Sequence, residues 1–119
     1  MFRKCLYNHD IHKYMFDYAQ SFLQAYTQLP NYVLLEFLDA HEPTLEAASY
    51  LDANLRDFLQ RIDDQGLITN DTLLMILSDH GSHQFLSEFI EPNNQTRVEA
   101  FSPLLIFHFP TEFVDSPQN

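Results

Sequence analysis

The sequence is poor in cysteine, in glycine and in positive charge. Cys5 is its single cysteine, so no disulfide can form within the chain and packing must stabilise the fold. Six Lys and Arg residues stand against 17 Asp and Glu residues, which gives a formal net charge of -11. This charge repels nucleic-acid phosphates and anionic membrane surfaces, so neither is expected as a partner. A bound divalent cation would relieve part of the repulsion.

Long apolar runs are also missing, so we expect no transmembrane segment. The first residues, MFRK, lead into polar sequence, and no signal peptide is visible. Asn-x-Thr triplets begin at Asn70 and Asn94 and give a weak indication of a secretory origin. The length of 119 residues, 45% of them hydrophobic, suits one domain with its own core. We expect a single partial domain over 1–119, with 111–119 as a frayed tail.

Two segments have helical periodicity. Apolar residues recur at three- and four-residue steps over 10–28, where Asp10 suits the N-cap and Pro30 limits extension. A second stripe covers 47–65, and Gly66 is placed as its C-terminal cap. Both stripes are typical of helices that pack against a core.

Three short apolar runs predict buried strands: YVLLEFL at 32–38, TLLMILS at 72–78 and PLLIFHF at 103–109. The stretch 82–100 is irregular, with one short helix expected at 85–90. The strand, helix and strand of 32–78 have the length of a βαβ unit, whose two strands should be parallel. The predicted class is therefore α/β, with helices packed on a mostly parallel sheet.

Polar residues follow directly after two of these predicted strands. Asp39 and His41 come after the strand at 32–38, and Asp79 and His80 come after the strand at 72–78. Ligands bind beyond the carboxyl ends of parallel strands, so the two pairs are expected to converge. Carboxylate and imidazole are ligands suited to zinc or a similar divalent ion. The plainer alternative is a polar turn, because strands often end in Asp and Gly.

For the other histidines, the sequence gives weaker grounds for predicting a role. His9 and His12 lie near the start of the first helix and are expected at the surface. His108 alternates with apolar neighbours in the third strand, which favours a partly buried structural role. His83 follows SDHG closely, and the sequence leaves its role open.

The region from about 31 to 110 resembles the alkaline phosphatase and sulfatase superfamily. The similar pieces are FLDAHEPT, YLDANLRDFLQRIDDQGL, ITNDTLLMILSDHG and VEAFSPLLIFHFP. The closest resemblance is to an uncharacterised sulfatase-like animal family, and it extends to CLYNHDIHKYMFDYAQSFLQAY at residues 5–26. It implies a partial alkaline-phosphatase-like sandwich and an interior fragment of a larger enzyme, one expected to be secreted or lumenal.

The resemblance also implies roles for four residues. Asp79 and His80 match a pair that binds a catalytic metal, zinc first, with calcium or manganese as alternatives. His41 matches a histidine that contacts the metal or the substrate, and Asp39 is a weaker match for a metal ligand. The substrate class would be small anionic phosphate or sulfate esters. The nucleophile is expected upstream, and Cys5 does not supply it because CLYNH lacks C-x-P-x-R.

Three hypotheses follow from these observations. The chain is part of a metal-dependent phosphate- or sulfate-ester hydrolase, with part of the metal site and no catalytic nucleophile of its own. Alternatively, it is a catalytically inactive sulfatase-like binding module that holds one metal weakly or none. The third hypothesis is a plain acidic α/β domain without a site. Phosphate and sulfate are not distinguished, and neither is the oligomeric state.

Overall fold

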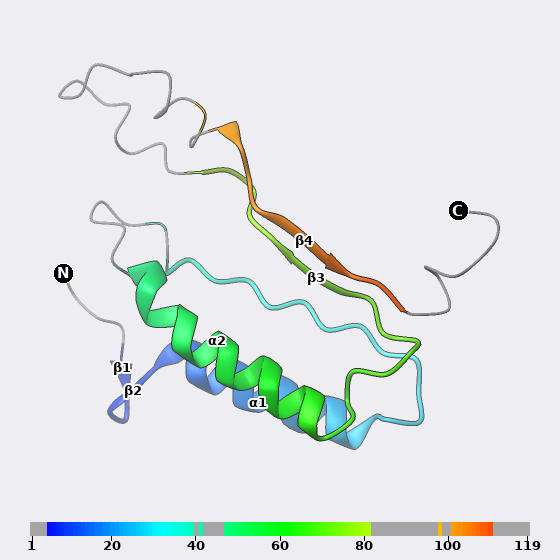
Figure 1. Ribbon diagram of the computed structural model, residues 1–119. Coiled ribbons are helices and arrows are strands. Elements are labelled where there is room, and N and C mark those ends of the chain that lie inside the picture. The colour runs from blue at the N-terminus through cyan, green and yellow to red at the C-terminus, as the bar shows by residue number, and fades with distance from the viewer. Residues whose placement is uncertain (1–4, 40, 42–46, 82–97, 99–100, 111–119) are drawn as a thin grey trace, which may run out of the picture. The chain divides into compact units, whose positions relative to one another are not determined.

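A computed structural model gives the fold of the chain (Figure 1). It describes residues 5–39, 41, 47–81, 98 and 101–110. The chain divides into two compact units, Met1–Ile68 and Thr69–Asn119. Each unit is described by itself.

The first unit opens with a tight hairpin. Strand β1, Cys5–Leu6, pairs antiparallel with strand β2, His9–Asp10. The two residues between them, Tyr7 and Asn8, have φ angles of 46° and 68°. Positive φ at both central positions is the geometry of two-residue hairpin turns, and Asn tolerates it well. The hairpin leads straight into the first helix.

Helix α1 spans Ile11–Ala25, so the predicted helix over 10–28 is confirmed with a shorter C-terminal end. Asp10 is its N-cap residue with extended backbone, as predicted, but its side chain makes no capping hydrogen bond. Helix α2 spans Ala47–Asp64. Gly66 follows with a φ of +65°, a left-handed conformation that confirms its predicted place after the helix.

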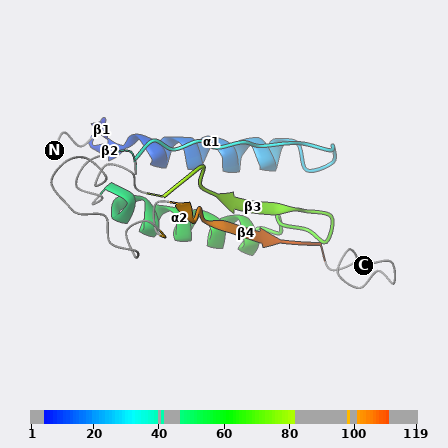
Figure 2. The ribbon, with the colours of Figure 1, turned by 90° about the horizontal axis from the view of Figure 1, so that it is seen from above.

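The two helices run side by side in the same direction (Figures 1 and 2). His12 near the start of α1 contacts Asn54 of α2, and Gln24 near the end of α1 contacts Gln65 just beyond α2. The chain between the helices must therefore return along their length. Figure 2 shows this returning segment in cyan beside α1.

The returning segment at 32–38 is extended but forms no strand, so the prediction of a strand at these residues is wrong. Its burial still alternates with a period of two residues. Val33, Leu35 and Phe37 pack against the core, whereas Tyr32 and Leu34 are exposed. A strand also needs a hydrogen-bonded neighbour, and the described residues supply none. The predicted βαβ unit therefore lacks its first strand.

The core of the first unit lies between α1, α2 and this segment. Phe16 is almost fully buried and stacks on Phe58 of α2 at a ring-centroid distance of 4.8 Å. It also lies 5.0 Å from the ring of Phe37. Ala19 and Ile62 complete the buried cluster. One aromatic side chain thus joins the three elements. The apolar stripe predicted for 47–65 is confirmed by this core, but the stripe predicted for 10–28 is not, because α1 buries Phe16 and Ala19 and leaves Tyr18 exposed.

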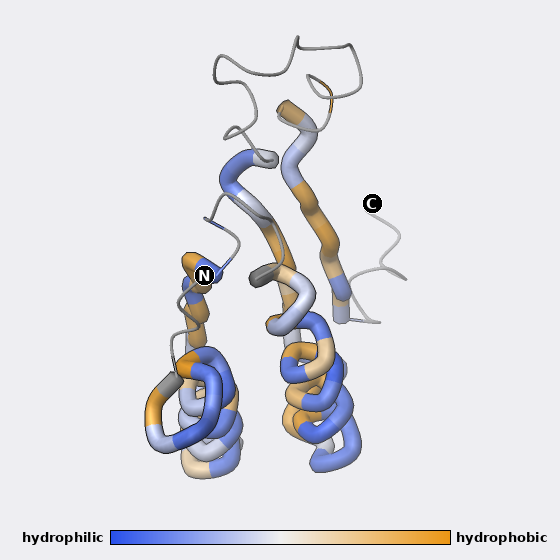
Figure 3. Tube along the Cα trace, turned by 90° about the vertical axis from the view of Figure 1, so that its left-hand side faces the viewer, coloured by the Kyte–Doolittle hydropathy of each residue, from blue (hydrophilic) through white to orange (hydrophobic). Residues whose placement is uncertain are grey.

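The second unit contains strands β3, Leu74–Leu77, and β4, Leu105–His108. The strands predicted over 72–78 and 103–109 are confirmed with shorter bounds, but their predicted burial is wrong, because every residue of β4 and alternate residues of β3 are exposed. They pair antiparallel, with Met75 opposite Phe107. Figure 3 shows the largely apolar character of both strands.

The α/β class is confirmed, but the prediction of a mostly parallel sheet is wrong for the described strands. Both two-stranded sheets are antiparallel. An apolar run is typical of a strand, but it carries no information on the direction of the neighbouring strand. It therefore does not specify the neighbour or the sense of pairing.

Several predictions fall outside the described residues: the short helix at 85–90, His83 and the tail at 111–119. Within the described part of the chain, neither helix combines the length and the apolar character needed to cross a bilayer.

Candidate functional site

The end of β3 is tied to the neighbouring strand by Ser78. Its backbone N–H donates to the carbonyl oxygen of Leu104 at 3.0 Å. Its Oγ accepts a hydrogen bond from the backbone N–H of Leu104 at 2.8 Å. These two bonds extend the ladder by one residue beyond Leu77, because the hydroxyl replaces a strand carbonyl as acceptor. The two hydrogen bonds to Leu104 therefore fix the backbone directly before Asp79 and His80.

Asp79 and His80 face each other across a short gap. Nε2 of His80 lies 3.3 Å from Oδ2 of Asp79. The other carboxylate oxygen, Oδ1, accepts a hydrogen bond from the backbone N–H of His80 at 2.9 Å. Nδ1 of His80 lies 2.6 Å from the carbonyl oxygen of Gly81. A carbonyl oxygen can only accept, so Nδ1 carries a proton and donates it.

This geometry leaves two chemical states for Nε2. An imidazolium would form an ion pair with Asp79 at this distance. A neutral imidazole would instead leave a lone pair on Nε2 near the lone pairs of Oδ2, and a cation bound by both atoms would relieve their repulsion. Two ligands at about 2.1 Å from a tetrahedral zinc ion lie roughly 3.4 Å apart. The separation of 3.3 Å fits that arrangement.

Both side chains are open to solvent. The side chain of Asp79 is 86% exposed and that of His80 is 44% exposed. A hydrated cation can reach them without any rearrangement of the strand. The hydrogen bond from Nδ1 to Gly81 also fixes the orientation of the ring, a common feature of metal-binding histidines.

The other predicted pair lies at the end of the returning segment. The Asp39 carboxylate is 35% exposed, and its Oδ1 lies 3.3 Å from Nδ1 of His12. His41 is exposed, and its backbone N–H donates to the carbonyl oxygen of Leu38 at 3.1 Å. This hydrogen bond joins a residue to the third residue before it, which is the pattern of a turn, and it lies directly after the extended segment.

The two pairs belong to different units, so their convergence at one site stays a prediction. Asp39 and His41 lie in the first unit, and Asp79 and His80 lie in the second. Among the described residues, no group of three or more His, Cys, Asp or Glu side chains is arranged to hold a metal ion. Carboxylate and imidazole, which are suitable zinc ligands, are thus present as two separate Asp/His pairs.

The structure corrects two predictions about histidines. His12 was expected at the surface, yet it is buried with 2% of its surface exposed. It lies on the same face of α1 as the buried Phe16 and Ala19, so its spacing of four and seven residues from them is a local signal of its burial. Its polar partners lie 27 and 42 residues away. His108 was expected to be partly buried, but it is exposed at the end of β4. His9 is exposed, as predicted.

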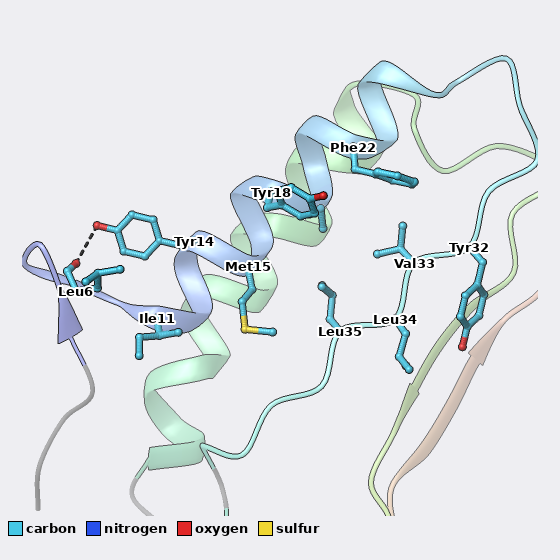
Figure 4. Close-up of a pocket in the computed structure, with 11 residues that line it drawn as sticks. Leu6, Ile11, Tyr14, Met15, Tyr18, Phe22, Tyr32, Val33, Leu34 and Leu35 are labelled. Atoms are coloured by element: carbon cyan, nitrogen blue, oxygen red, sulfur yellow. Dashed lines mark hydrogen bonds between the residues drawn. The ribbon is translucent and has the colours of Figure 1, made fainter.

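An apolar cavity lies on the first unit, apart from any carboxylate or imidazole (Figure 4). Its volume is about 470 Å³. Figure 4 shows Val33 and Leu35 pointing toward α1, and Tyr14 donating a hydrogen bond to the carbonyl oxygen of Leu6. No charged side chain lines the cavity, so it offers apolar contact rather than acid–base or metal chemistry.

A match to a known protein family covers nearly the whole chain. Residues 1–117 match the family described as "Protein of unknown function (DUF229)". The chain belongs to this family. No curated protein and no solved structure matches the chain. The DUF229 match includes both Asp/His pairs and also the N-terminal hairpin and α1, which hold the buried His12.

Proposed function

We propose that this DUF229 chain carries part of the metal site of a sulfatase-like hydrolase that acts on phosphate or sulfate esters. The observation that carries the proposal is the 3.3 Å separation of Nε2 of His80 and Oδ2 of Asp79. The sequence resemblance around SDHG and the net charge of -11 also support it. A chain this acidic gains electrostatic free energy when it binds a divalent cation.

Asp79 and His80 would supply a carboxylate and an imidazole ligand to the metal, and the sequence resemblance adds Asp39 and His41 as predicted ligands. Zinc suits this mixed oxygen and nitrogen set best, with calcium or manganese as alternatives. A bound divalent ion would supply Lewis-acid stabilisation of charge on the transferred group. His41 would also donate a hydrogen bond to an oxygen of a small anionic ester.

None of the chain's residues is assigned as a nucleophile. Asp79 and His80 would contribute ligand positions, and Ser78 would hold them at the end of β3. We also propose a secreted or lumenal setting for the family, supported by the exposed Asn70 at the start of an Asn-x-Thr triplet.

Calorimetric titration with zinc tests the proposal. Wild-type chain should release binding heat, and His80→Ala should reduce the affinity by roughly 10-fold or more, because it removes a ligand. His108→Ala is the matched control, since it removes an exposed histidine from the same unit. Identical heats for wild type and His80→Ala would remove the metal role.

A catalytically inactive binding module is the second candidate. It is favoured by the absence of a three-ligand group among the described residues. Hydrolysis of an aryl phosphate and an aryl sulfate separates the two functions. We expect little or no turnover by this chain alone. Turnover that disappears in Asp79→Ala would instead show a working catalytic site.

A further inference from the structure

His12 is the most deeply buried polar side chain in the described part of the chain, and it lies between three elements. It stands on the first turn of α1, and its ring lies edge-on to Phe16 at a centroid distance of 6.2 Å. Its Nε2 lies 2.8 Å from Nδ2 of Asn54 on α2. Its Nδ1 lies 3.3 Å from Oδ1 of Asp39, at the end of the returning segment. Both ring nitrogens therefore have a partner.

The direction of these hydrogen bonds follows from Asn54. Its Nδ2 lies 3.4 Å from the carbonyl oxygen of Tyr50 as well as 2.8 Å from the ring of His12. A carbonyl oxygen can only accept, so the amide must present its nitrogen on this side. The amide nitrogen then donates to Nε2 of His12, which leaves the ring proton on Nδ1. Nδ1 donates that proton to Asp39.

The result is a chain of hydrogen bonds that ends on a partly exposed carboxylate. Asn54 fixes the tautomer of His12, and His12 holds one oxygen of Asp39, whose side chain is still 35% exposed. An acidic ligand held in this way binds a cation with less loss of conformational freedom. Partners that orient a ligand typically account for 10- to 100-fold in metal affinity.

We propose that His12 and Asn54 are positioning residues, which orient Asp39 toward a divalent cation. This inference rests on the proposed function, because it requires Asp39 to be a ligand. It assigns a task to a buried histidine that the proposed ligand set does not use. The competing explanation is that His12 only satisfies polar groups in the core.

Zinc affinity of the full chain, measured by competition with a chromophoric chelator, separates these explanations. His12→Phe keeps a ring of similar size but removes both hydrogen bonds, and it should weaken zinc binding roughly 10-fold. His12→Asn keeps an N–H near the place of Nδ1 and should retain an affinity within about threefold of wild type. A residue that only satisfies polar groups in the core would leave zinc affinity unchanged in both variants.

Asn54→Ala covers the case in which His12→Phe does not fold. Alanine favours the helix more than asparagine does, so a loss of affinity cannot come from a weaker α2. We expect a loss of several-fold. Ile62→Val is the control for stability, because it reduces core packing on α2 without removing a polar partner. It should leave zinc affinity unchanged.

The outcomes distinguish this inference from the proposed function. If Asp39→Asn weakens zinc binding while His12→Phe and Asn54→Ala bind normally, the positioning role is wrong and the metal site stands. If Asp39→Asn binds zinc normally, Asp39 is no ligand and the inference falls. If the chain binds no zinc, both proposals fall. Independently, ¹⁵N NMR of the His12 ring should show the proton on Nδ1, and a proton on Nε2 would contradict the hydrogen-bond chain.

Discussion

Nε2 of His80 lies 3.3 Å from Oδ2 of Asp79, and Nδ1 of the same ring is held by the carbonyl oxygen of Gly81. The imidazole is thus oriented from one side and faces a carboxylate on the other. This relationship between neighbouring residues is independent of how the two units are arranged. It is the geometric basis for the metal site that we propose.

Asp79→Asn should weaken zinc binding by roughly 10- to 100-fold without lowering the stability of the chain. The substitution removes an anionic ligand from a side chain that is 86% exposed, so no packing is lost. Asp71→Asn is the matched control, since it removes one exposed carboxylate from the same unit. An equal loss in both variants would point to general electrostatic attraction instead of a specific site.

Ser78→Ala should lower the free energy of unfolding by about 0.5–1 kcal/mol. The backbone N–H of Leu104 loses its acceptor, and water replaces it in part because Leu104 is exposed. Hydrogen exchange at the Leu104 amide should become faster. Ser78→Thr keeps the hydroxyl and should exchange like wild type. Unchanged exchange in Ser78→Ala would show that the side chain does not hold the strand end.

Phe16→Ala should lower the free energy of unfolding by about 3–5 kcal/mol. The ring of Phe16 contacts Phe58 and Phe37, so its loss opens a cavity between both helices and the returning segment. Tyr18→Ala, on the same helix but exposed, should change stability by less than about 0.5 kcal/mol. Urea unfolding followed by circular dichroism measures both. Similar midpoints for the two variants would contradict this description of the core.

Gly66→Ala should destabilise the chain by about 1 kcal/mol. A Cβ at this position would meet no atom within 4 Å, so the cost comes from the φ of +65° alone. Gly66→Asn should cost less, because Asn tolerates the left-handed conformation better. Urea midpoints of the three proteins should therefore fall in the order Gly, Asn, Ala. A midpoint for Ala above that for Asn would contradict the conformational explanation.

The helices could be predicted from the sequence because their signals are local. Three- and four-residue spacing marks α1 and α2, and Gly66 marks the end of α2. The apolar run at 32–38 predicted a buried strand, whereas its burial alternates and it has no strand partner among the described residues. Pairing depends on residues far along the chain, which a single apolar run does not identify.

The residues of the candidate site also differ in how far the local sequence predicts them. Asp79 and His80 follow a strong apolar strand, and that local pattern is enough to single them out. The burial of His12 has a local signal, its spacing to Phe16 and Ala19 on one face of α1, but its hydrogen-bond partners Asp39 and Asn54 lie far away in sequence and could not be predicted. The prediction of an exposed His12 relied on its place near the start of a helix. The packing of α1 beside α2 buries the face that carries His12 and Phe16 instead.

The most direct test is zinc-edge X-ray absorption on the full chain loaded with one equivalent of zinc. We expect nitrogen or oxygen neighbours at about 2.0–2.1 Å from the zinc with imidazole outer-shell scattering. His80→Ala should reduce the imidazole signal, and His108→Ala should leave it unchanged. A spectrum of water oxygens alone, or one that His80→Ala does not alter, would contradict the metal site at Asp79 and His80.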